Sequence, residues 1–163
     1  MGEILRPATA DDARKIFDWR NDPWIANLSA TGPIESWDDH TRWFREALCS
    51  DRHLLFVIRT DEGIEVGTVR LDKADESKGN ITIYMLRDYT GHGLGVRVLK
   101  EACQNAFTEW TWLQSIHALI RQERQEHIAH DGSRKAFSKA GFVLVPSRAA
   151  SSHEYIEMAL VRS

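Results

Sequence analysis

Between residues 80 and 107 the chain combines a strand, a glycine-rich turn and an amphipathic helix, and this segment constrains the fold most. Ile81–Leu86 is mostly β-branched, aromatic or apolar, which predicts a largely buried strand. The turn then places glycines at alternate positions, Gly91, Gly93 and Gly95. Apolar residues recur at helical spacing after it, at Leu94, Val98, Leu99, Ala102, Cys103, Ala106 and Phe107. Free amides at such a helix start bind anions, so the segment predicts a phosphorylated ligand.

The glycine spacing discriminates among three known phosphate-binding loops. A dinucleotide fingerprint needs Gly-x-Gly-x-x-Gly, but its last position counted from Gly91 is Val96. A nucleoside-triphosphate loop ends in Gly-Lys-Ser/Thr, which is missing here. Thr90-Gly-His-Gly-Leu-Gly95 resembles instead the Arg/Gln-x-x-Gly-x-Gly/Ala loop of the GNAT family of N-acetyltransferases, with Thr90 in place of the usual Arg or Gln. The resemblance implies acetyl-CoA as cosubstrate, with its pyrophosphate held by the loop amides.

The other strand and helix signals predict one α/β (α+β mixed) domain over residues 1–163. Further strands are expected at residues 4–8, 53–60, 64–72, 115–120, 142–145 and 155–161. Helices are expected after capping boxes at Thr9–Asp12 and Ser36–Asp39, and from a Ser133 cap to Gly141, with an irregular link at residues 24–33. This order resembles the acetyltransferase fold along the whole chain. It implies a mostly antiparallel sheet of about seven strands with helices on both faces.

Charge and composition narrow the partners. Among 163 residues, 21 basic and 24 acidic side chains give a net charge of -3, so we expect neither a nucleic-acid nor a membrane partner. Cys49 and Cys103 lie on apolar faces of predicted helices and are expected to be reduced core residues. We expect a cytoplasmic location, because the start of the chain lacks an apolar signal region. The protein is expected to be a monomer or a homodimer. His127 and His130 have no accompanying ligand set, so no metal is expected.

The resemblance also implies candidates for the chemistry. The family's strand before the loop offers backbone amides to the thioester and pantetheine, which here corresponds to Tyr84, Met85 and Leu86. Ser133-Arg-Lys-Ala-Phe-Ser-Lys-Ala-Gly-Phe142 resembles the family's late helix, but Phe137 stands where a Tyr usually acts as acid. A phenyl ring donates no proton, so the catalytic candidates are Tyr84, Tyr89 and Asp72. Glu65 and His92 are further possible bases, and a water chain is an alternative to any single base.

The cofactor-binding candidates that follow from the resemblance are Tyr84, Met85, Leu86, Thr90, Gly91, His92, Gly93, Leu94, Gly95, Val96, His130, Ser133 and Phe137. Five basic residues are candidates for the adenosine 3′-phosphate: Arg97, Lys100, Arg134, Lys135 and Lys139. The substrate-binding candidates are Trp19, Arg20, Asn21 and Trp24, because the first two helices wall the acceptor pocket in this family.

The function expected from these observations is transfer of an acetyl group from acetyl-CoA to a primary amine, by direct attack in a ternary complex. The Trp19–Pro23 segment resembles the branch that acetylates amino groups of nucleotide-activated sugars, so an amino sugar is the first expectation. Peptide N-termini and antibiotic amines are alternatives within the class. A non-catalytic acyl-CoA sensor that kept the fold is the alternative from another class, favoured by the Phe137 substitution.

Overall fold

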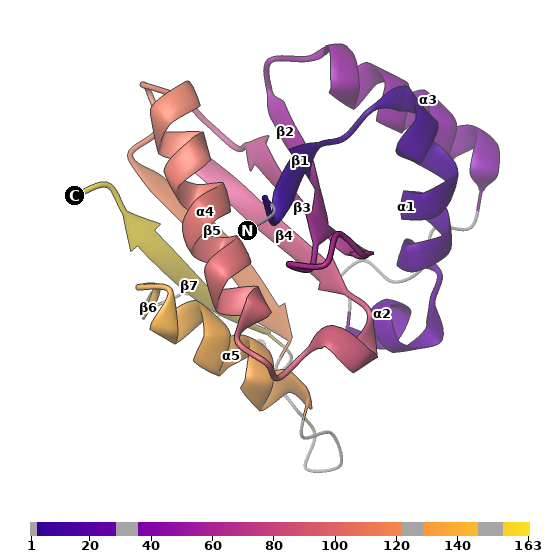
Figure 1. The fold of residues 1–163 in the computed structure, drawn as a ribbon. Helices are drawn as coiled ribbons and strands as arrows, with labels where there is room; N and C mark the ends of the chain where they lie inside the picture. The colour runs from indigo at the N-terminus through magenta and orange to yellow at the C-terminus, as the bar shows by residue number, and fades with distance from the viewer. Residues whose placement is uncertain (1–2, 29–35, 122–128, 147–154) are drawn as a thin grey trace.

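The computed structural model describes residues 3–28, 36–121, 129–146 and 155–163. Within them, a seven-stranded sheet carries helices on both faces (Figure 1). The strands are β1 (Leu5–Pro7), β2 (His53–Arg59), β3 (Glu65–Lys73), β4 (Lys78–Met85), β5 (Ser115–Arg121), β6 (Val143–Leu144) and β7 (Tyr155–Val161). The helices are α1 (Ala13–Arg20), α2 (Pro23–Leu28), α3 (Trp37–Cys49), α4 (Leu94–Glu109) and α5 (Ala129–Lys139), with short 3₁₀ turns at Ala10–Asp12 and Arg87–Tyr89. The mixed, mostly antiparallel architecture expected from the sequence is confirmed.

The strand order is β1-β2-β3-β4-β5-β7-β6, and the only parallel neighbours among the described strands are β4 and β5. These two strands pair only over Lys78–Asn80 against Ser115–His117. β4 continues to Met85 with β3 alone as its partner in the described part of the chain. The two strands therefore part at the end of β4 that leads into the glycine loop.

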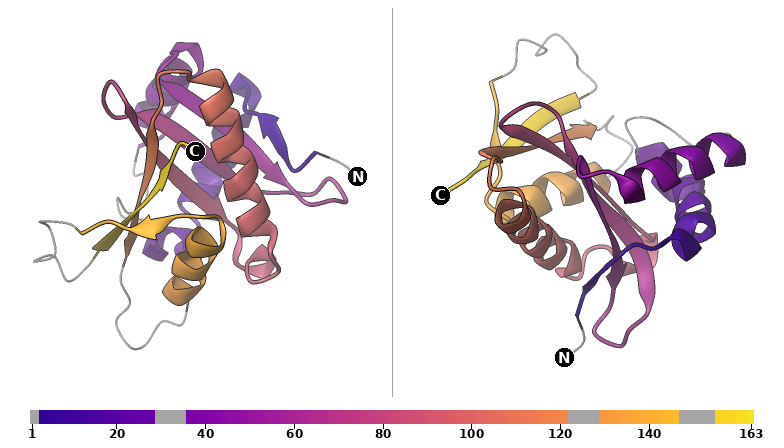
Figure 2. Two further views of the ribbon diagram at one scale, coloured as in Figure 1. Left: turned by 90° about the vertical axis from the view of Figure 1, so that its left-hand side faces the viewer. Right: turned by 90° about the horizontal axis from the view of Figure 1, so that it is seen from above.

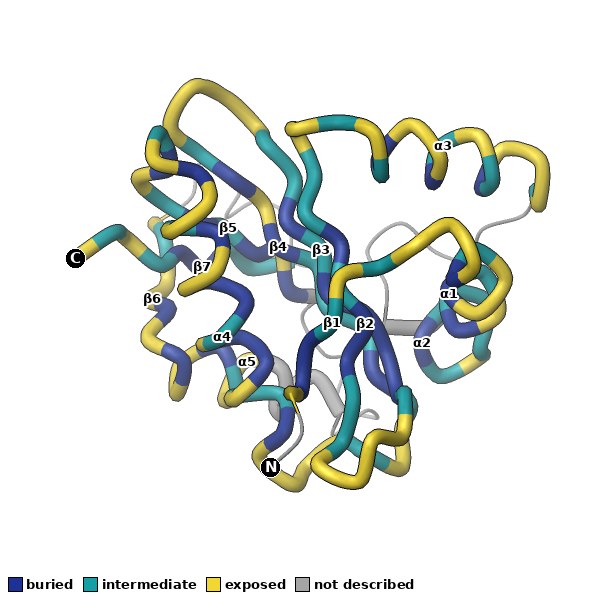
Figure 3. Tube along the Cα trace, turned by 45° about the horizontal axis from the view of Figure 1, so that its top comes forward, coloured by how far each residue is buried: buried dark blue, intermediate teal, exposed yellow. Residues whose placement is uncertain are grey.

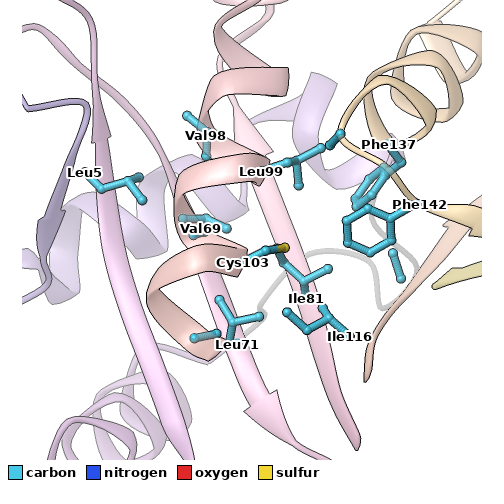
Figure 4. Close-up of a cluster of buried hydrophobic side chains, with 14 of the residues drawn as sticks. Leu5, Val69, Leu71, Ile81, Val98, Leu99, Cys103, Ile116, Phe137 and Phe142 are labelled. Carbon is cyan, nitrogen blue, oxygen red and sulfur yellow. The ribbon is translucent and has the colours of Figure 1, made fainter. Parts of the chain in front are cut away.

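Two apolar clusters pack against the sheet. The helices that contribute to them lie on opposite faces of the sheet (Figure 2). The larger one packs α4 and α5 against β3, β4 and β5, with Val98, Leu99, Cys103 and Phe137 among its members (Figure 4). The smaller one packs α1, α2 and α3 against β2 through Ile16, Trp19, Ile25, Phe44, Ala47, Leu55 and Val57. Exposed residues recur along the outer sides of these helices, as amphipathic periodicity requires (Figure 3). The sheet is thus a wall with separate helical layers on its two sides.

The expectation of an irregular link at residues 24–33 is wrong over residues 24–28, which belong to α2, and residues 29–33 lie outside the described residues. Pro23 occupies the first helical position, where its missing amide costs nothing and its fixed φ favours the helix. The Asp22 carboxylate caps this helix by accepting from the amides of Trp24 and Ile25, at 3.0 and 3.4 Å. The side chain of Ile25 is 1% exposed, so burial stabilises a helix too short to stand alone.

Two smaller expectations also need correction. Ser133 does not start α5, which begins at Ala129 and runs through Ser133 to Lys139. Extending a helix anchored by buried Phe137 and Ala140 costs less than nucleating it, so the cap preference is overridden. Cys49 is exposed at the end of α3, whereas Cys103 is buried as expected, and both are free thiols. Burial raises the pKa of the Cys103 thiol to about 12, so it stays protonated.

An ion-pair network joins β1 and β3 to α1 and to the 3₁₀ turn that precedes it. Arg6 of β1 binds both oxygens of Asp12 at 2.7 and 2.8 Å, and it also binds Glu65 of β3. Lys15 of α1 binds the same Glu65 carboxylate. The Arg6 guanidinium, together with Lys15, holds the pKa of Glu65 at about 2. These contacts fix α1 to the sheet at the edge of the cavity described next.

Candidate active site

The glycine loop has the backbone geometry that an anion site requires. Gly91 and Gly93 have φ of 80° and 82°, the left-handed region that favours glycine. A Cβ at either position would meet no atom within 4 Å, so the dihedral angle, not space, requires glycine here. Gly93 is the N-cap of α4, and the amides of the first helical turn, Leu94–Val96, have no carbonyl partner inside the helix. His92 and Thr90 are exposed beside them, and the donor set fits a pyrophosphate.

The open side of β4 offers fewer amide donors than the sequence predicts. The Leu86 amide donates to the Val66 carbonyl at 2.9 Å and is therefore engaged with β3. Because successive amides alternate along a strand, the Tyr84 amide also faces β3, and the Met85 amide faces the gap where β5 parts from β4. The Met85 sulfur packs toward the start of α4, with Sδ 3.9 Å from where a Cβ at Gly95 would stand. Met85 thus connects the strand opening to the glycine loop.

A cavity of about 340 Å³ lies on the other face of β4. Its helical wall comes from α1 and α3: Ile16, Arg20, Asp39, His40 and Trp43. Its strand wall comes from β2, β3 and β4: His53, Leu55, Thr68, Arg70, Asp72, Thr82 and Tyr84. The volume is in the range of small-molecule pockets. Tyr84 lines the cavity with its side chain, and the amide of the next residue, Met85, faces the strand opening, so the two halves of the site meet at Tyr84–Met85.

The far end of the cavity holds a charged network. The Arg70 Nε donates to the Oδ2 of Asp72 at 2.9 Å, and the His53 Nδ1 lies 2.6 Å from Oδ1 of the same carboxylate. The Arg70 guanidinium also stacks on the ring of Trp43, with its carbon 4.8 Å from the ring centroid. Asp72 therefore holds both Arg70 and His53 in place. In the β3–β4 register Asp72 is opposite Asn80, four residues from Tyr84, a distance of about 13 Å along the strand.

Half-buried Arg20 and buried His40, both from the helices, complete the wall. Arg20 stacks on the Tyr84 ring at 4.6 Å, and burial together with the charge of Arg70 lowers the pKa of Arg20 to about 10. His40 is 3% exposed, and its Nε2 lies 2.9 Å from the Ala13 carbonyl, which makes Nε2 the protonated nitrogen. Burial lowers the pKa of His40, so the ring is neutral near pH 7.

Of the four predicted substrate-binding residues, Arg20 alone is among the described residues that line the cavity. Trp19 is buried in the smaller apolar cluster. Asn21 follows the last residue of α1, and its side-chain amide donates to the Phe17 carbonyl at 3.0 Å. Trp24 lies on α2 with the Arg87 guanidinium 5.0 Å from its ring centroid. Because Arg87 follows β4 by two residues, this contact places Trp24 near the end of β4.

The remaining predicted residues are dispersed. Tyr89 packs against the α4 side of the sheet, and Phe137 is buried there, edge-on to Phe142 at 5.0 Å. Glu65 is engaged by Arg6 and Lys15 and does not line the cavity in the described chain. His130 and Ser133 lie on α5, but their side chains are outside the described part, and His127 is outside it entirely. Arg97 of α4 binds Asp61 with both terminal nitrogens at 3.1 Å.

Sequence reasoning missed most of the cavity wall, including His40, His53 and Arg70. One signal was present in the sequence. Thr68, Arg70 and Asp72 alternate with apolar residues in β3, which places three polar side chains on one face of a central strand. Polar residues on a face covered by helices indicate either an ion network or a ligand cavity.

Residues 4–143 match the sequence profile of the acetyltransferase (GNAT) domain. A search among curated proteins finds no match. Across the described ranges, none of the helices has the length and apolarity that a membrane crossing needs. The same ranges contain no group of three or more His, Cys, Asp and Glu side chains arranged to hold a metal ion.

Three solved structures share the fold at low sequence identity. The spermidine N-acetyltransferase of Vibrio cholerae, solved with CoA and spermine, has a TM-score of 0.77 at 17% identity, covering 96% of this chain and 94% of that one. The aminoglycoside acetyltransferase AAC(6')-Ib, solved with coenzyme A and kanamycin, has a TM-score of 0.75 at 15% identity, with coverage of 97% and 94%. A domain from Methanocaldococcus jannaschii DSM 2661 has a TM-score of 0.76 at 18% identity, with coverage of 98% and 97%.

Proposed function

Because the chain belongs to the GNAT family of acetyltransferases, we propose that it transfers the acetyl group of acetyl-CoA to a primary amine bound in the cavity between α1, α3 and the sheet. The observation that carries this proposal is the meeting of two sites at Tyr84–Met85. The amides at the start of α4 approach this point from one face of the sheet, and the cavity reaches it from the other. A thioester held on the first face would present its carbonyl to an amine held on the second.

Acetyl transfer is a nucleophilic substitution at the thioester carbonyl. The lone pair of the neutral amine attacks the thioester carbon, a C–N bond forms, and the C–S bond breaks. The amine nitrogen loses one proton, the departing thiolate gains one, and the products are an acetamide and free coenzyme A. The Met85 amide, which faces the strand opening, is the donor that supports negative charge on the carbonyl oxygen. No chemical step needs a metal ion.

Tyr84 is the strongest candidate for the acid, because its side chain lines the cavity and it directly precedes Met85, whose amide faces the strand opening. Tyr89, two residues before the glycine loop, is the alternative on the cofactor side. Phe137 serves the fold, since its ring is buried against Phe142. Asp72 lies about 13 Å from Tyr84 along the strands, so it acts on a bound amine only through intervening groups or water.

An amino sugar is the acceptor that we propose first, on the resemblance of the Trp19–Pro23 segment and on the aromatic wall that Trp43 and Tyr84 give the cavity. Two structural neighbours were solved with spermine and with kanamycin, which makes polyamines and antibiotic amines the alternatives within the class. A peptide N-terminus is a further alternative. A non-catalytic acyl-CoA sensor is the alternative from another class.

Thermal unfolding with acetyl-CoA, followed by thiol release, tests the proposal. Acetyl-CoA at about one hundred times its dissociation constant should stabilise the protein by about 2.7 kcal/mol. Release of free coenzyme A thiol should then depend on adding an amine. Stabilisation without turnover of any amine would support the sensor alternative, and the absence of stabilisation would contradict the whole proposal.

A further inference from the structure

The cavity has an uneven distribution of charge along its length. Its formal charges balance, because Arg20 and Arg70 face Asp39 and Asp72. The Asp39 side chain, however, is 75% exposed on the first turn of α3, which places its charge at the rim. Solvent screens such a charge strongly. The interior charge is therefore decided by Asp72 and the two arginines.

Asp72 is not available to attract a cationic substrate. Its two carboxylate oxygens are taken up by the Arg70 Nε and the His53 Nδ1, at 2.9 and 2.6 Å. A carboxylate that already holds two donors offers little net negative charge to a third group. A polycationic amine would thus find its only interior carboxylate occupied within the described part of the cavity.

Arg70, in contrast, has hydrogen-bond donors that can bind an anion. Its Nε is used by Asp72, but no described residue accepts a hydrogen bond from its terminal Nη1 or Nη2. Its side chain is 27% exposed and lines the cavity, and stacking on Trp43 fixes the plane of the guanidinium. A planar pair of donors held in one orientation is the arrangement that binds a carboxylate or phosphate through two parallel hydrogen bonds.

Arg20 strengthens the same preference. It lines the cavity from α1, and the charge of Arg70 contributes to lowering its pKa to about 10, so the two guanidinium groups repel each other. An anion bound near both groups would relieve this repulsion. His40, which also lines the cavity, is neutral near pH 7 and contributes no charge to its interior. The repulsion between the two guanidinium groups therefore favours an anion over a cation beside Arg70.

The sheet register sets the distance between this anion site and the reaction. Arg70 pairs with Thr82, and Thr82 is two residues before Tyr84, where acetyl transfer is proposed to occur. Two residues of extended strand span about 7 Å. We propose that the acceptor is an anionic amine whose carboxylate or phosphate is held by Arg70, a residue whose backbone position is about 7 Å along the sheet from that of Tyr84. This inference rests on the proposed acetyl transfer and narrows its acceptor class.

Matched amines test the inference through thiol release. The anionic set is 5-aminopentanoate, 3-aminopropyl phosphate and glucosamine 6-phosphate. The comparison set is pentylamine, 1,5-diaminopentane and glucosamine, which keep similar size without the negative charge. At least one anionic amine should exceed the comparison amines that lack its acidic group in kcat/KM by about 10- to 100-fold. The phosphate and carboxylate arms distinguish the two anion sources.

Arg70→Gln should remove this advantage mainly by raising the KM of the anionic amines. Arg14→Gln removes the same charge from an outward position on α1, where the side chain is 69% exposed, and should keep the preference. Arg70→Lys, which keeps the charge but loses the planar pair of donors, should be intermediate. Acetyl-CoA stabilisation of each variant shows that it is folded.

The outcomes separate the inference from the function on which it rests. If the comparison amines have a kcat/KM equal to or higher than that of the anionic amines, the proposal of an anionic acceptor is wrong, while acetyl transfer itself still stands. An anionic preference that survives unchanged in Arg70→Gln would overturn the role of Arg70. Acetyl-CoA binding without turnover of any amine in the panel would overturn the proposed function and this inference with it.

Discussion

The two faces of β4 carry sites that are built in different ways. On the α4 face, the donors are backbone amides at the start of one helix, and a glycine loop beside it supplies the required dihedral angles. On the other face, the cavity wall consists of side chains from α1, α3 and three strands. A site made of backbone depends on a few local residues, whereas a site made of side chains depends on how distant segments pack. The two should therefore respond differently to substitution.

Gly93→Val is expected to have the largest effect, and it should fall on the cofactor side alone. A β-branched residue at a φ of 82° costs about 1–3 kcal/mol of backbone strain, so the loop should abandon its geometry. Affinity for acetyl-CoA, measured by calorimetry, should fall by about 10- to 100-fold or more.

Gly95→Ala is the matched control for this loop. Gly95 has no positive φ, and a Cβ there would stand 3.9 Å from the Met85 sulfur, an ordinary contact. Affinity should change by about twofold or less. Equal affinities of the wild type and Gly93→Val would show that the loop does not hold the cofactor.

Tyr84→Phe tests the point where the two faces meet. Removing a hydroxyl that protonates the leaving thiolate should lower kcat by about tenfold or more while acetyl-CoA affinity stays the same. Steady-state kinetics with an accepted amine measures this change. Tyr89→Phe is the companion variant, and whichever one loses kcat identifies the acid. If both variants keep the wild-type kcat, neither hydroxyl has that role.

Glu65→Gln weakens the ion-pair network at the edge of the acceptor side. Arg6 and Lys15 lower the pKa of Glu65 from 4.5 to about 2 in the folded protein. The carboxylate therefore stabilises the fold above about pH 4.5, and this stabilisation is lost as the pH falls toward 2. Urea unfolding should show a loss of about 1–2 kcal/mol at pH 7 that disappears near pH 2. A loss independent of pH would contradict the ionic origin.

Thr90→Arg is expected to have the smallest effect, and in the favourable direction. Thr90 is exposed, and its hydroxyl donates to the Arg87 carbonyl at 2.7 Å, a contact within one turn. An arginine at this position adds an exposed cation beside the α4 amides. Acetyl-CoA affinity should rise by about fivefold at most, and the gain should shrink at high salt. Unchanged affinity at low salt would place the phosphates beyond reach of residue 90.

The fold was predictable wherever local signals agreed with packing. Ser36 caps α3 by accepting from the Asp39 amide at 3.1 Å, and Gly141 ends α5 with a φ of 102°, both as expected from residue type. Prediction failed at Pro23, where a helix starts, and at Ser133, which lies inside one. At both places burial of nearby apolar side chains decides between local conformations of similar energy.

The sequence by itself determined the side of this protein that is proposed to bind the cofactor. Gly91 and Gly93 between an apolar strand and an amphipathic helix specify an anion site, because dihedral angles and free helix amides are local properties. Only the tertiary structure decided the acceptor side. Arg70 and His53 share Asp72, and Arg20 faces the same cavity, because α1 and α3 fold over strands distant in the chain. Long-range packing sets which side chains converge, and spacing along the chain carries little of that information.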